Sequence, residues 1–532
     1  MASSPIDSVG GAVTANDDSA KEAVTAMQSP EVADKPASPD APAGAAAALE
    51  DIELTEESPK AAAAAEPTPA DSTAGGGAGA GSSADVQSED HPLIFIAVNP
   101  SSGNKKGADY VKVGEPIGET GVRKLDLDVQ VNNAKTVTLL IFNIKEGKPS
   151  NKPGFQHLKR VVEASSLDLP TRIIVAGGDG TITWAVEEMD AHGIPSEQVL
   201  LGVKAFGTGN DFSRSYNWGK GSPSDVIGGS TFKVLKKDVS MWLTAKTAPH
   251  DIWGLEIETH EGGNFKYVTG YNQKGINDGL CAQHRIVDVD GGGKKSTKTM
   301  CNYFSFGPES RVGMGMERRR KASWAGNQLM YGFSGLSTMC CKKSPKLKDV
   351  VTNAVETLPD GTPKVIFQTD TPPPKKPTDP QPDGPYLRRW PATFAILNTD
   401  TMIAGQHIWD RTGARLAVKG EGEQRETLMQ GVHKMGDGKL NMMTWRTMQQ
   451  FNCDAVCGLC CSCVCCGLRG SNRLASIGNP VTINFRDKEQ ANYRKEGRIY
   501  MQIDGEYFIC QYPKAIRIKH REKLHVLDNR SS

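Results

Sequence analysis

Apolar runs alternate with amphipathic stretches along the chain from residue 91 to about residue 219. The runs are nearly continuous in Val, Ile, Leu and Phe, and the stretches between them have the spacing of helices. Strands that are apolar throughout and alternate with helices are typical of a parallel sheet covered on both faces. The predicted strands are Leu93–Val98, Val137–Phe142, Arg172–Ala176 and Val199–Phe206, and the predicted helices are Gly154–Ala164 and Thr181–Ala191.

Beyond this α/β unit the pattern changes to short strand-like runs separated by Gly and Pro. Their spacing predicts a larger, mostly antiparallel β domain with one helix near Ser323–Met339. Asp360–Pro385 is rich in proline and is expected to be a surface insertion. The predicted strands are Thr393–Leu397, Leu440–Trp445, Val481–Phe485, Arg498–Ile503 and Ala515–Lys519.

Charge and composition set the first 90 residues apart. They hold 17 Asp and Glu against 3 Lys and Arg, and they are otherwise mostly Ala, Pro, Ser and Gly. Such a segment cannot bury enough apolar surface to offset its backbone entropy, so we expect a disordered acidic tail. The expected organisation is a tail over 1–90, an α/β domain over 91–235, a β-rich domain over 236–522 with insertions at 355–388 and 452–468, and a C-terminal tail over 523–532.

The sequence also limits how the chain relates to membranes. No run of apolar residues is long enough for a transmembrane helix, the N-terminal segment lacks the pattern of a secretory signal, and Ala2 excludes myristoylation. Without a signal, disulfides among the 12 cysteines are not expected. We therefore expect a cytoplasmic protein that associates peripherally with membranes.

Three strand ends carry small polar residues. The first, Asn99-Pro-Ser-Ser-Gly103, would let backbone N–H groups face an anion, although a plain turn explains it equally well. The second, Gly177-Gly-Asp-Gly-Thr181, places one carboxylate among three glycines before a helix. Asp179 there suits a metal ion, a substrate hydroxyl or proton abstraction.

The third strand end reads Gly207-Thr-Gly-Asn-Asp211 and continues through Phe212 to Arg214. Ligands bind open α/β sheets at the carboxyl ends of the strands, so the loops should line one cleft. None of these loops has the Walker A sequence or the dinucleotide G-x-G-x-x-G fingerprint. They predict a phosphate cradle of another kind.

These three motifs resemble the signatures of the diacylglycerol kinase catalytic domain, within the superfamily of the NAD and sphingosine kinases. In the C-terminal half, Cys301–Gly307, Met330–Gly332, Leu397-Asn398 and Gln502–Glu506 resemble the accessory domain of eukaryotic diacylglycerol kinases. Two features depart from the family: Ala205-Phe206 stands where Pro-Leu is usual, and no cysteine-rich zinc module or calcium-binding loop is present. The replacement of Pro-Leu by Ala205-Phe206 keeps every polar group of the third motif.

The resemblance implies a parallel-sheet nucleotide-binding domain and a β-rich accessory domain that transfer the ATP γ-phosphoryl group, with Mg²⁺, to diacylglycerol and so make phosphatidic acid. It implies Asp179, Asp504 and Glu506 as catalytic carboxylates, with Asp179 also as a metal ligand. Asp504-Gly505 is equally compatible with a simple hairpin turn. The implied nucleotide-binding residues are Asn99, Ser102, Gly103, Gly177, Gly178, Gly180, Thr181, Gly207, Thr208, Gly209, Asn210 and Asp211.

A lipid substrate requires contact with a membrane. The chain outside the acidic tail is basic, and Arg318–Lys321 followed by Trp324 could bind anionic lipids, or could simply be a solvated helix face.

A second candidate for membrane contact is a dense cysteine cluster, whose spacing is too tight for paired zinc ligands. It suits S-acylation, with a metal or redox role or an inert loop as alternatives. Its members are Cys453, Cys457, Cys460, Cys461, Cys463, Cys465 and Cys466.

Two other functions stay open at this stage. The acceptor could be another lipid alcohol, a sphingoid base or ceramide, although the accessory-domain motifs argue against this. The chain could instead be a catalytically silent, ATP-binding membrane adaptor, although the intact Gly-Gly-Asp-Gly and Gln-Ile-Asp-Gly-Glu motifs argue against that. We expect no nucleic acid partner.

Overall fold

The structure is a computed structural model of the chain, and it describes most of residues 91–530. The described residues all belong to one compact unit, Ala80–Ser532. The predicted acidic tail, the basic segment Arg318–Lys321 with Trp324 and the predicted helix Ser323–Met339 lie outside the described residues. The gaps within 91–530 are 132–133, 166–169, 208, 268–284, 318–344, 377–378, 381–384, 388, 404, 412–416, 420–427, 429–430, 457–469 and 494–496.

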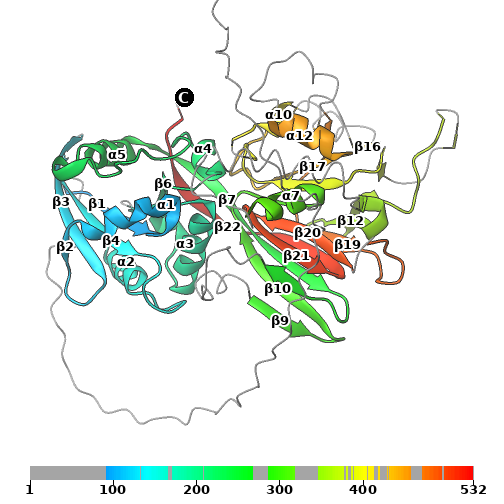
Figure 1. Ribbon diagram of the computed structural model, residues 1–532, viewed down its shortest axis with the longest axis horizontal. Helices are drawn as coiled ribbons and strands as arrows, with labels where there is room; N and C mark the ends of the chain where they lie inside the picture. The colour runs from blue at the N-terminus through cyan, green and yellow to red at the C-terminus, as the bar shows by residue number, and fades with distance from the viewer. Residues whose placement is uncertain are drawn as a thin grey trace, which may run out of the picture. The chain divides into compact units, whose positions relative to one another are not determined.

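The first half of the described chain is the predicted parallel sheet (Figure 1). Its four parallel strands pair in the order β6-β5-β1-β4, and β3 and β2 extend it antiparallel at one edge. All four strands expected from the apolar runs are confirmed. The bounds are β1 Leu93–Val98, β2 Glu115–Pro116, β3 Val122–Val131, β4 Ala134–Asn143, β5 Thr171–Gly177 and β6 Val199–Ala205.

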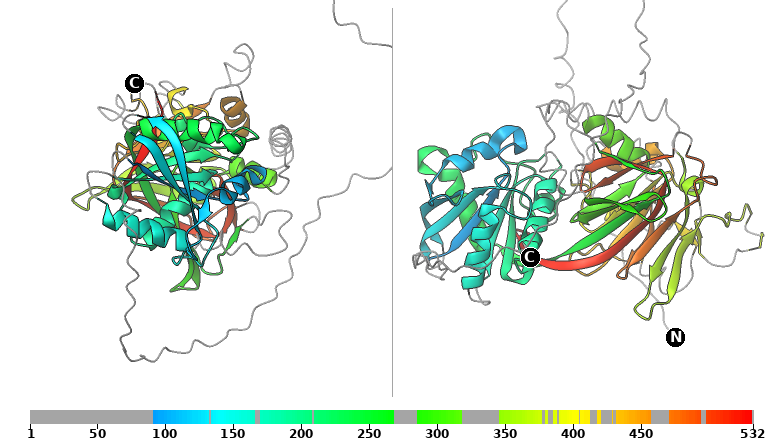
Figure 2. Two further views of the ribbon diagram at one scale, coloured as in Figure 1. Left: turned by 90° about the vertical axis from the view of Figure 1, so that its left-hand side faces the viewer. Right: turned by 90° about the horizontal axis from the view of Figure 1, so that it is seen from below.

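Helices cover this sheet on both faces. The side chains of β1 divide between two cores: Phe95 packs with α2 and α3 on one face, and Ile96 packs with α5 and η2 on the other. Figures 1 and 2 show the helices on either side of the strands. Both predicted helices are confirmed. The bounds are α2 Pro153–Ala164, α3 Asp179–Ala191, α5 Lys233–Thr244 and η2 Lys106–Lys112.

The second half contains an antiparallel sheet of seven strands, as the sequence predicts. On one face its apolar side chains, among them Phe304, Phe394 and Met501, belong to a large core that it shares with the strands of the neighbouring sheet. On the other face Leu397 and Trp445 belong to a second core with residues of α12 (Met448–Val456). α7 (Pro308–Glu317) and α12 lie next to the sheet. The order is β18 Ser471–Ile477, β17 Leu440–Trp445, β15 Thr393–Leu397, β11 Tyr303–Phe306, β20 Arg498–Ile503, β21 Glu506–Gln511 and β8 Phe265–Tyr267.

One long strand at the end of the chain joins the two halves. β22 (Pro513–Asp528) pairs antiparallel with β7 (Lys246–Thr259) along its length, and near its end it pairs parallel with β6 through His525 and Val526. Figure 2 shows it running from one half to the other. Residues 523–532 were expected to be a C-terminal tail, whereas the strand continues to Asp528. Alternate residues there are buried against the parallel sheet, so the strand does not end at 522.

The predicted proline-rich insertion also differs from its expected structure. Pro363–Gln368 forms β13, which pairs with β12 (Val351–Thr357), and Phe367 is fully buried in the large core. The consecutive apolar residues Val365, Ile366 and Phe367, of which the last two are buried, outweigh the prolines on either side. The other elements are β9 Arg285–Val289, β10 Gly293–Met300, β14 Tyr386–Leu387, β16 Val418–Lys419, β19 Val481–Phe485, α1 Ser102–Lys105, α4 Asp211–Ser215, α9 Leu347–Val350, α10 Ile408–Arg411, η3 Ser196–Gln198 and η4 Gly229–Thr231.

Two observations bear on the membrane predictions. None of the helices within the described ranges is both long and apolar enough to span a bilayer. Of the cysteine cluster, only Cys453 is described: it lies in α12 and is partly buried. Cys457, Cys460, Cys461, Cys463, Cys465 and Cys466 lie outside the described residues, so acylation stays a prediction.

Candidate active site

The three motif loops meet at the carboxyl ends of β1, β5 and β6. The side-chain amide of Asn99 donates a hydrogen bond to Thr181 Oγ1 at 3.2 Å, which ties the first loop to the second. The first loop also contacts the third, because a Cβ atom on Gly103 would lie 2.5 Å from the carbonyl oxygen of Phe206. The prediction that these loops line one edge of the sheet is confirmed.

Glycine is required where the second and third loops touch. A Cβ atom on Gly207 would lie 2.8 Å from the Cα of Gly178, and one on Gly178 would lie 3.1 Å from the Cα of Gly207. The backbones therefore pass each other without side chains between them. The first turn of α3 begins here, and the N–H groups of a helix's first turn have no partner within the helix. This backbone arrangement can bind phosphate.

Asp179 links the second and third loops at this edge of the sheet. It is the first residue of α3, and its carboxylate accepts hydrogen bonds from the backbone N–H of Asp211 at 3.1 Å and of Phe212 at 3.0 Å. Burial raises the pKa of Asp179 to about 7, and the neighbouring carboxylate of Asp211 adds to the effect. The side chain that the sequence singles out thus holds the start of α4 in place.

Asp211 connects the parallel-sheet half to the β-rich half. Its carboxylate accepts hydrogen bonds from the Tyr303 hydroxyl at 2.9 Å and from the backbone N–H of Gly405 at 2.7 Å. The hydroxyl of Thr401 donates to its backbone carbonyl. Asp211 is 2% exposed, so it joins the two halves from a buried position.

The other predicted nucleotide-binding residues shape the loops. Asn210 has a left-handed backbone (φ 52°), and its side-chain amide donates to the carbonyls of Gly207 at 2.7 Å and Lys220 at 3.0 Å. Ser102 opens α1, and its N–H donates to the carbonyl of Asn99. Gly209 lies beside Asp179, because a Cβ atom on it would be 3.4 Å from Asp179 Oδ2. Thr208 lies outside the described residues.

Asp504 reaches the same region from the turn between β20 and β21. Its carboxylate accepts backbone N–H bonds from Cys301 at 2.7 Å, Asn302 at 2.7 Å and Tyr303 at 3.0 Å. The hydroxyl of Thr183, on α3, donates a fourth hydrogen bond at 3.0 Å. Burial raises the pKa of Asp504 to about 6, although the three N–H bonds act in the opposite direction. All four acceptor positions of this carboxylate are therefore in use.

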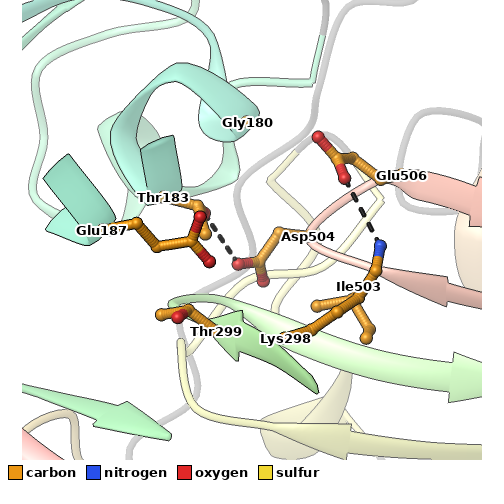
Figure 3. A pocket seen from close by; sticks show the side chains of 8 residues that line it. All are labelled: Gly180, Thr183, Glu187, Lys298, Thr299, Ile503, Asp504 and Glu506. Carbon is orange, nitrogen blue, oxygen red and sulfur yellow. Dashed lines mark hydrogen bonds and ion pairs between the residues drawn. The ribbon is translucent and has the colours of Figure 1, made fainter. Parts of the chain in front are cut away.

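Glu506 begins β21 beside a small pocket that α3 also lines (Figure 3). Its Oε2 lies 3.5 Å from the ammonium of Lys298, on β10, and its Oε1 lies 3.2 Å from the position a Cβ atom would take on Gly180. Its side chain is 27% exposed, in contrast to the buried Asp504. The pocket is lined by Gly180, Thr183, Glu187, Lys298, Thr299, Ile503, Asp504 and Glu506.

Sequence reasoning missed several residues of the site. Lys298, Thr183 and Glu187 line the pocket, but they belong to no motif, and nothing in their local pattern distinguishes them. Lys145 was missed too: it follows β4, and its ammonium donates to Ser101 Oγ at 2.7 Å. Its place three residues after the apolar run Val137–Phe142, at the same sheet edge as the three motifs, could have identified it.

The described side chains do not form a preformed metal cage. No group of three or more His, Cys, Asp or Glu residues suited to a metal occurs within the described ranges. Mg²⁺ in phosphoryl-transfer sites is commonly held by one or two carboxylates together with substrate phosphates. Asp179 uses one acceptor position on each oxygen, so its carboxylate retains capacity for such a contact.

A glycine-lined edge of a parallel sheet, with buried carboxylates from two domains around it, defines a phosphate-handling α/β protein. Comparison with known families is more specific. Residues 93–238 match the family described as the diacylglycerol kinase catalytic domain, and residues 299–507 match the diacylglycerol kinase accessory domain. The chain belongs to the diacylglycerol kinase family and contains both of its characteristic domains.

Individual relatives agree with this assignment. The chain is 22% identical over 451 residues to probable diacylglycerol kinase 3 of Caenorhabditis elegans, covering 83% of this chain and 44% of the relative. It is 26% identical over 243 residues to diacylglycerol kinase 3 of Arabidopsis thaliana, covering 43% of this chain and 44% of the relative. The chain therefore spans less than half the length of these curated relatives.

Among solved structures, the chain is similar to a putative diacylglycerol kinase from Bacillus anthracis. The likeness covers 82% of this chain and 97% of the other, with 12% identity and a TM-score of 0.36.

Proposed function

We propose that this protein transfers the γ-phosphoryl group of ATP to the primary hydroxyl of 1,2-diacylglycerol and releases phosphatidic acid and ADP. The observation that carries the proposal is the convergence of the three glycine loops with Glu506 at the first turn of α3. The glycine loops are suited to binding phosphate, and Glu506 offers a carboxylate to an alcohol. Membership of the family supports diacylglycerol as the alcohol.

The phosphates of ATP would lie along the loop backbones. The N–H groups at Gly178 and Gly180, at the start of α3, would face the phosphate oxygens, and the loop that begins at Gly207 would form the opposite wall. Lys145 would add a positive charge from the end of β4. Phosphoryl transfer depends largely on positioning and charge neutralisation, and this edge supplies both.

Mg²⁺ would complete the charge balance. Asp179 is the residue placed to contact it, together with the phosphates themselves. When bound, the ion would neutralise charge on the phosphate oxygens. The chain's own contribution is to keep Asp179 fixed by two backbone N–H groups.

Glu506 suits the role of base better than Asp504. Both were predicted as catalytic, but Asp504 uses all four acceptor positions on backbone and hydroxyl donors, whereas Glu506 lies at the pocket with its side chain 27% exposed. In the proposed step the lipid hydroxyl oxygen bonds to the γ-phosphorus, and the bond to the bridging oxygen of ADP breaks. The hydroxyl proton passes to the Glu506 carboxylate.

The experiment that tests this proposal is radiolabelled phosphoryl transfer from Mg-ATP to a panel of lipids in mixed micelles. Diacylglycerol should accept the label, while sphingosine and ceramide should not. The variant Asp179→Asn should transfer far less, with its fold verified by circular dichroism. Labelling of sphingosine or ceramide instead would identify a different lipid kinase. ATP binding without transfer to any lipid would favour the silent adaptor.

A diacylglycerol substrate implies contact with a membrane surface, so we further propose peripheral membrane association aided by anionic lipids. The basic excess outside the first 90 residues supports this. Vesicle flotation should show more binding to phosphatidylserine vesicles than to phosphatidylcholine vesicles. Palmitate labelling that hydroxylamine removes, and that Cys→Ser replacement across 453–466 abolishes, would establish acylation of the cysteine cluster.

A further inference from the structure

Lys298 is a buried cation that no motif accounts for. Its side chain is 3% exposed, and its ammonium lies 5.0 Å from the ring centre of Tyr267 and 4.8 Å from that of Phe508. Aromatic faces attract a cation but do not replace its hydration fully. A buried ammonium is costly unless a carboxylate accompanies it, so its partners indicate why it is there.

Those partners are the carboxylates around the pocket. Glu506 Oε2 lies 3.5 Å from Lys298 Nζ. Glu187, on α3, and Asp504 also act on the ammonium and oppose the lowering of the Lys298 pKa by burial. Burial raises the pKa of Glu187 to about 7, which reduces its capacity to balance a fixed positive charge near neutral pH. Glu506 is therefore the closest ionic partner (Figure 3).

The position of the Glu506 carboxylate is set from two sides. One oxygen faces Lys298, on β10, and the other lies 3.2 Å from where a Cβ atom on Gly180 would be. Glu506 is the first residue of β21 and pairs with Ile503, and the torsions of its side chain allow several directions from that point. The ammonium therefore selects the direction that brings the carboxylate to the first turn of α3.

We propose that Lys298 is a positioning residue that holds the Glu506 carboxylate against the first turn of α3, oriented to accept the proton of the acceptor hydroxyl. This inference rests on the proposed function, in which Glu506 is the base. Lys298 is not assigned a contact with substrate, because its ammonium is enclosed between two rings and carboxylates. The competing explanation is that Lys298 only balances buried charge and contributes to stability.

The chain offers a matched control for that explanation. Lys152 is likewise a buried lysine, its ammonium lies 4.8 Å from the ring centre of Trp184, and it is 3.9 Å from a carboxylate oxygen of α3, that of Glu188. It does not line the pocket. Lys152→Met removes the same kind of buried cation from beside α3 without removing a partner of Glu506.

The test measures kcat and KM for Mg-ATP in the wild type, Lys298→Met, Glu506→Gln, their double variant and Lys152→Met. Lys298→Met should lower kcat by about ten- to a hundredfold, within the range of a mispositioned base, and leave KM for Mg-ATP within twofold. The double variant should be no slower than Glu506→Gln alone, because Lys298 acts through Glu506. Lys152→Met should lower the melting temperature with kcat unchanged.

Several outcomes would overturn the inference. Multiplying losses in the double variant would show that Lys298 acts independently of Glu506, and an equal loss of kcat in Lys152→Met would make its effect purely structural. If Lys298→Met fails to fold, Lys298→Met/Glu187→Gln removes the excess buried negative charge. That variant should have the melting temperature of the wild type but a low kcat, and wild-type kcat in it would overturn the proposal.

A wild type that labels no lipid defeats the proposed function as well. An active wild type together with unchanged kcat in Lys298→Met defeats only this inference.

Discussion

The glycine-lined edge of the parallel sheet and the Asp504–Glu506 turn of the antiparallel sheet form the two sides of the candidate site, and they are held in different ways. At the edge, backbone packs directly against backbone, because a Cβ atom on Gly207 would lie 2.8 Å from the Cα of Gly178. The Asp179 carboxylate holds the loops together by accepting two backbone N–H bonds. The turn offers side chains instead. Asp504 secures it to residues 301–303, and Glu506 projects from it into the pocket.

The carboxylates of the two regions differ in what they contact. Asp504 is buried and Asp179 is partly buried, and both accept backbone N–H bonds that fix a neighbouring segment. Glu506 is partly exposed and pairs with a lysine instead. A carboxylate within a motif, such as Asp504, can therefore be required because it holds the backbone in place. The proposed reacting group is then a neighbouring residue, here Glu506.

The largest expected effect is on Glu506. Glu506→Gln keeps the size of the side chain but cannot accept the hydroxyl proton, so kcat should fall by about 10²- to 10⁴-fold. Steady-state phosphoryl transfer to diacylglycerol measures this, with calorimetry confirming unchanged Mg-ATP binding. Wild-type turnover in this variant would remove Glu506 from the chemistry.

Asp504→Asn should act mainly on stability. The amide turns an N–H donor toward groups that themselves donate, so one or two buried N–H groups lose their acceptor, at a cost of about 1–3 kcal/mol. The free energy of unfolding, measured in urea at pH 8, tests this. An unchanged urea midpoint together with a loss of activity would instead make Asp504 a reacting group.

On the glycine edge, Gly207→Ala should weaken ATP binding. The new Cβ would lie 2.6 Å from Asn210 Oδ1 and 2.8 Å from the Cα of Gly178, so the loops must separate. We expect KM for Mg-ATP to rise about tenfold, which corresponds to about 1.4 kcal/mol. Gly221→Ala is the matched control, because no atom lies within 4 Å of its Cβ position and its φ is not positive. Equal effects of the two substitutions would contradict close packing of the loops.

Proton linkage at Asp504 makes the stability of the protein depend on pH. The pKa of Asp504 is raised from 3.8 to about 6, so between these values the folded protein keeps a proton that the unfolded chain releases. This carboxyl's contribution to the free energy of unfolding therefore falls as pH rises from about 4 to 6 and then levels off. Urea titrations from pH 4 to 8 should show a steeper fall between pH 4 and 6 in the wild type than in Asp504→Asn, in which Asp179 and Glu187 still contribute. Parallel curves would mean that the folded state does not raise this pKa.

Much of the fold follows from local pattern. The apolar runs of β1, β4, β5 and β6 predict a parallel sheet because each strand is buried on both faces, and short segments carry that signal without reference to the rest of the chain. Two boundaries were missed. β13 lies within a proline-rich stretch, and β22 continues beyond 522, because packing against distant strands decided both.

The sequence by itself determined which loops lie together at the edge proposed to bind phosphate, since the carboxyl ends of neighbouring parallel strands must lie at one edge. The resemblance of its Gln502–Glu506 motif to the accessory domain also predicted Glu506 as a site residue. Only the tertiary structure decided that Asp504 is saturated by hydrogen bonds and that Lys298 accompanies Glu506. The physical reason is distance along the chain: Lys298 and Glu506 come from β10 and β21, and their charges interact only because folding buries them together.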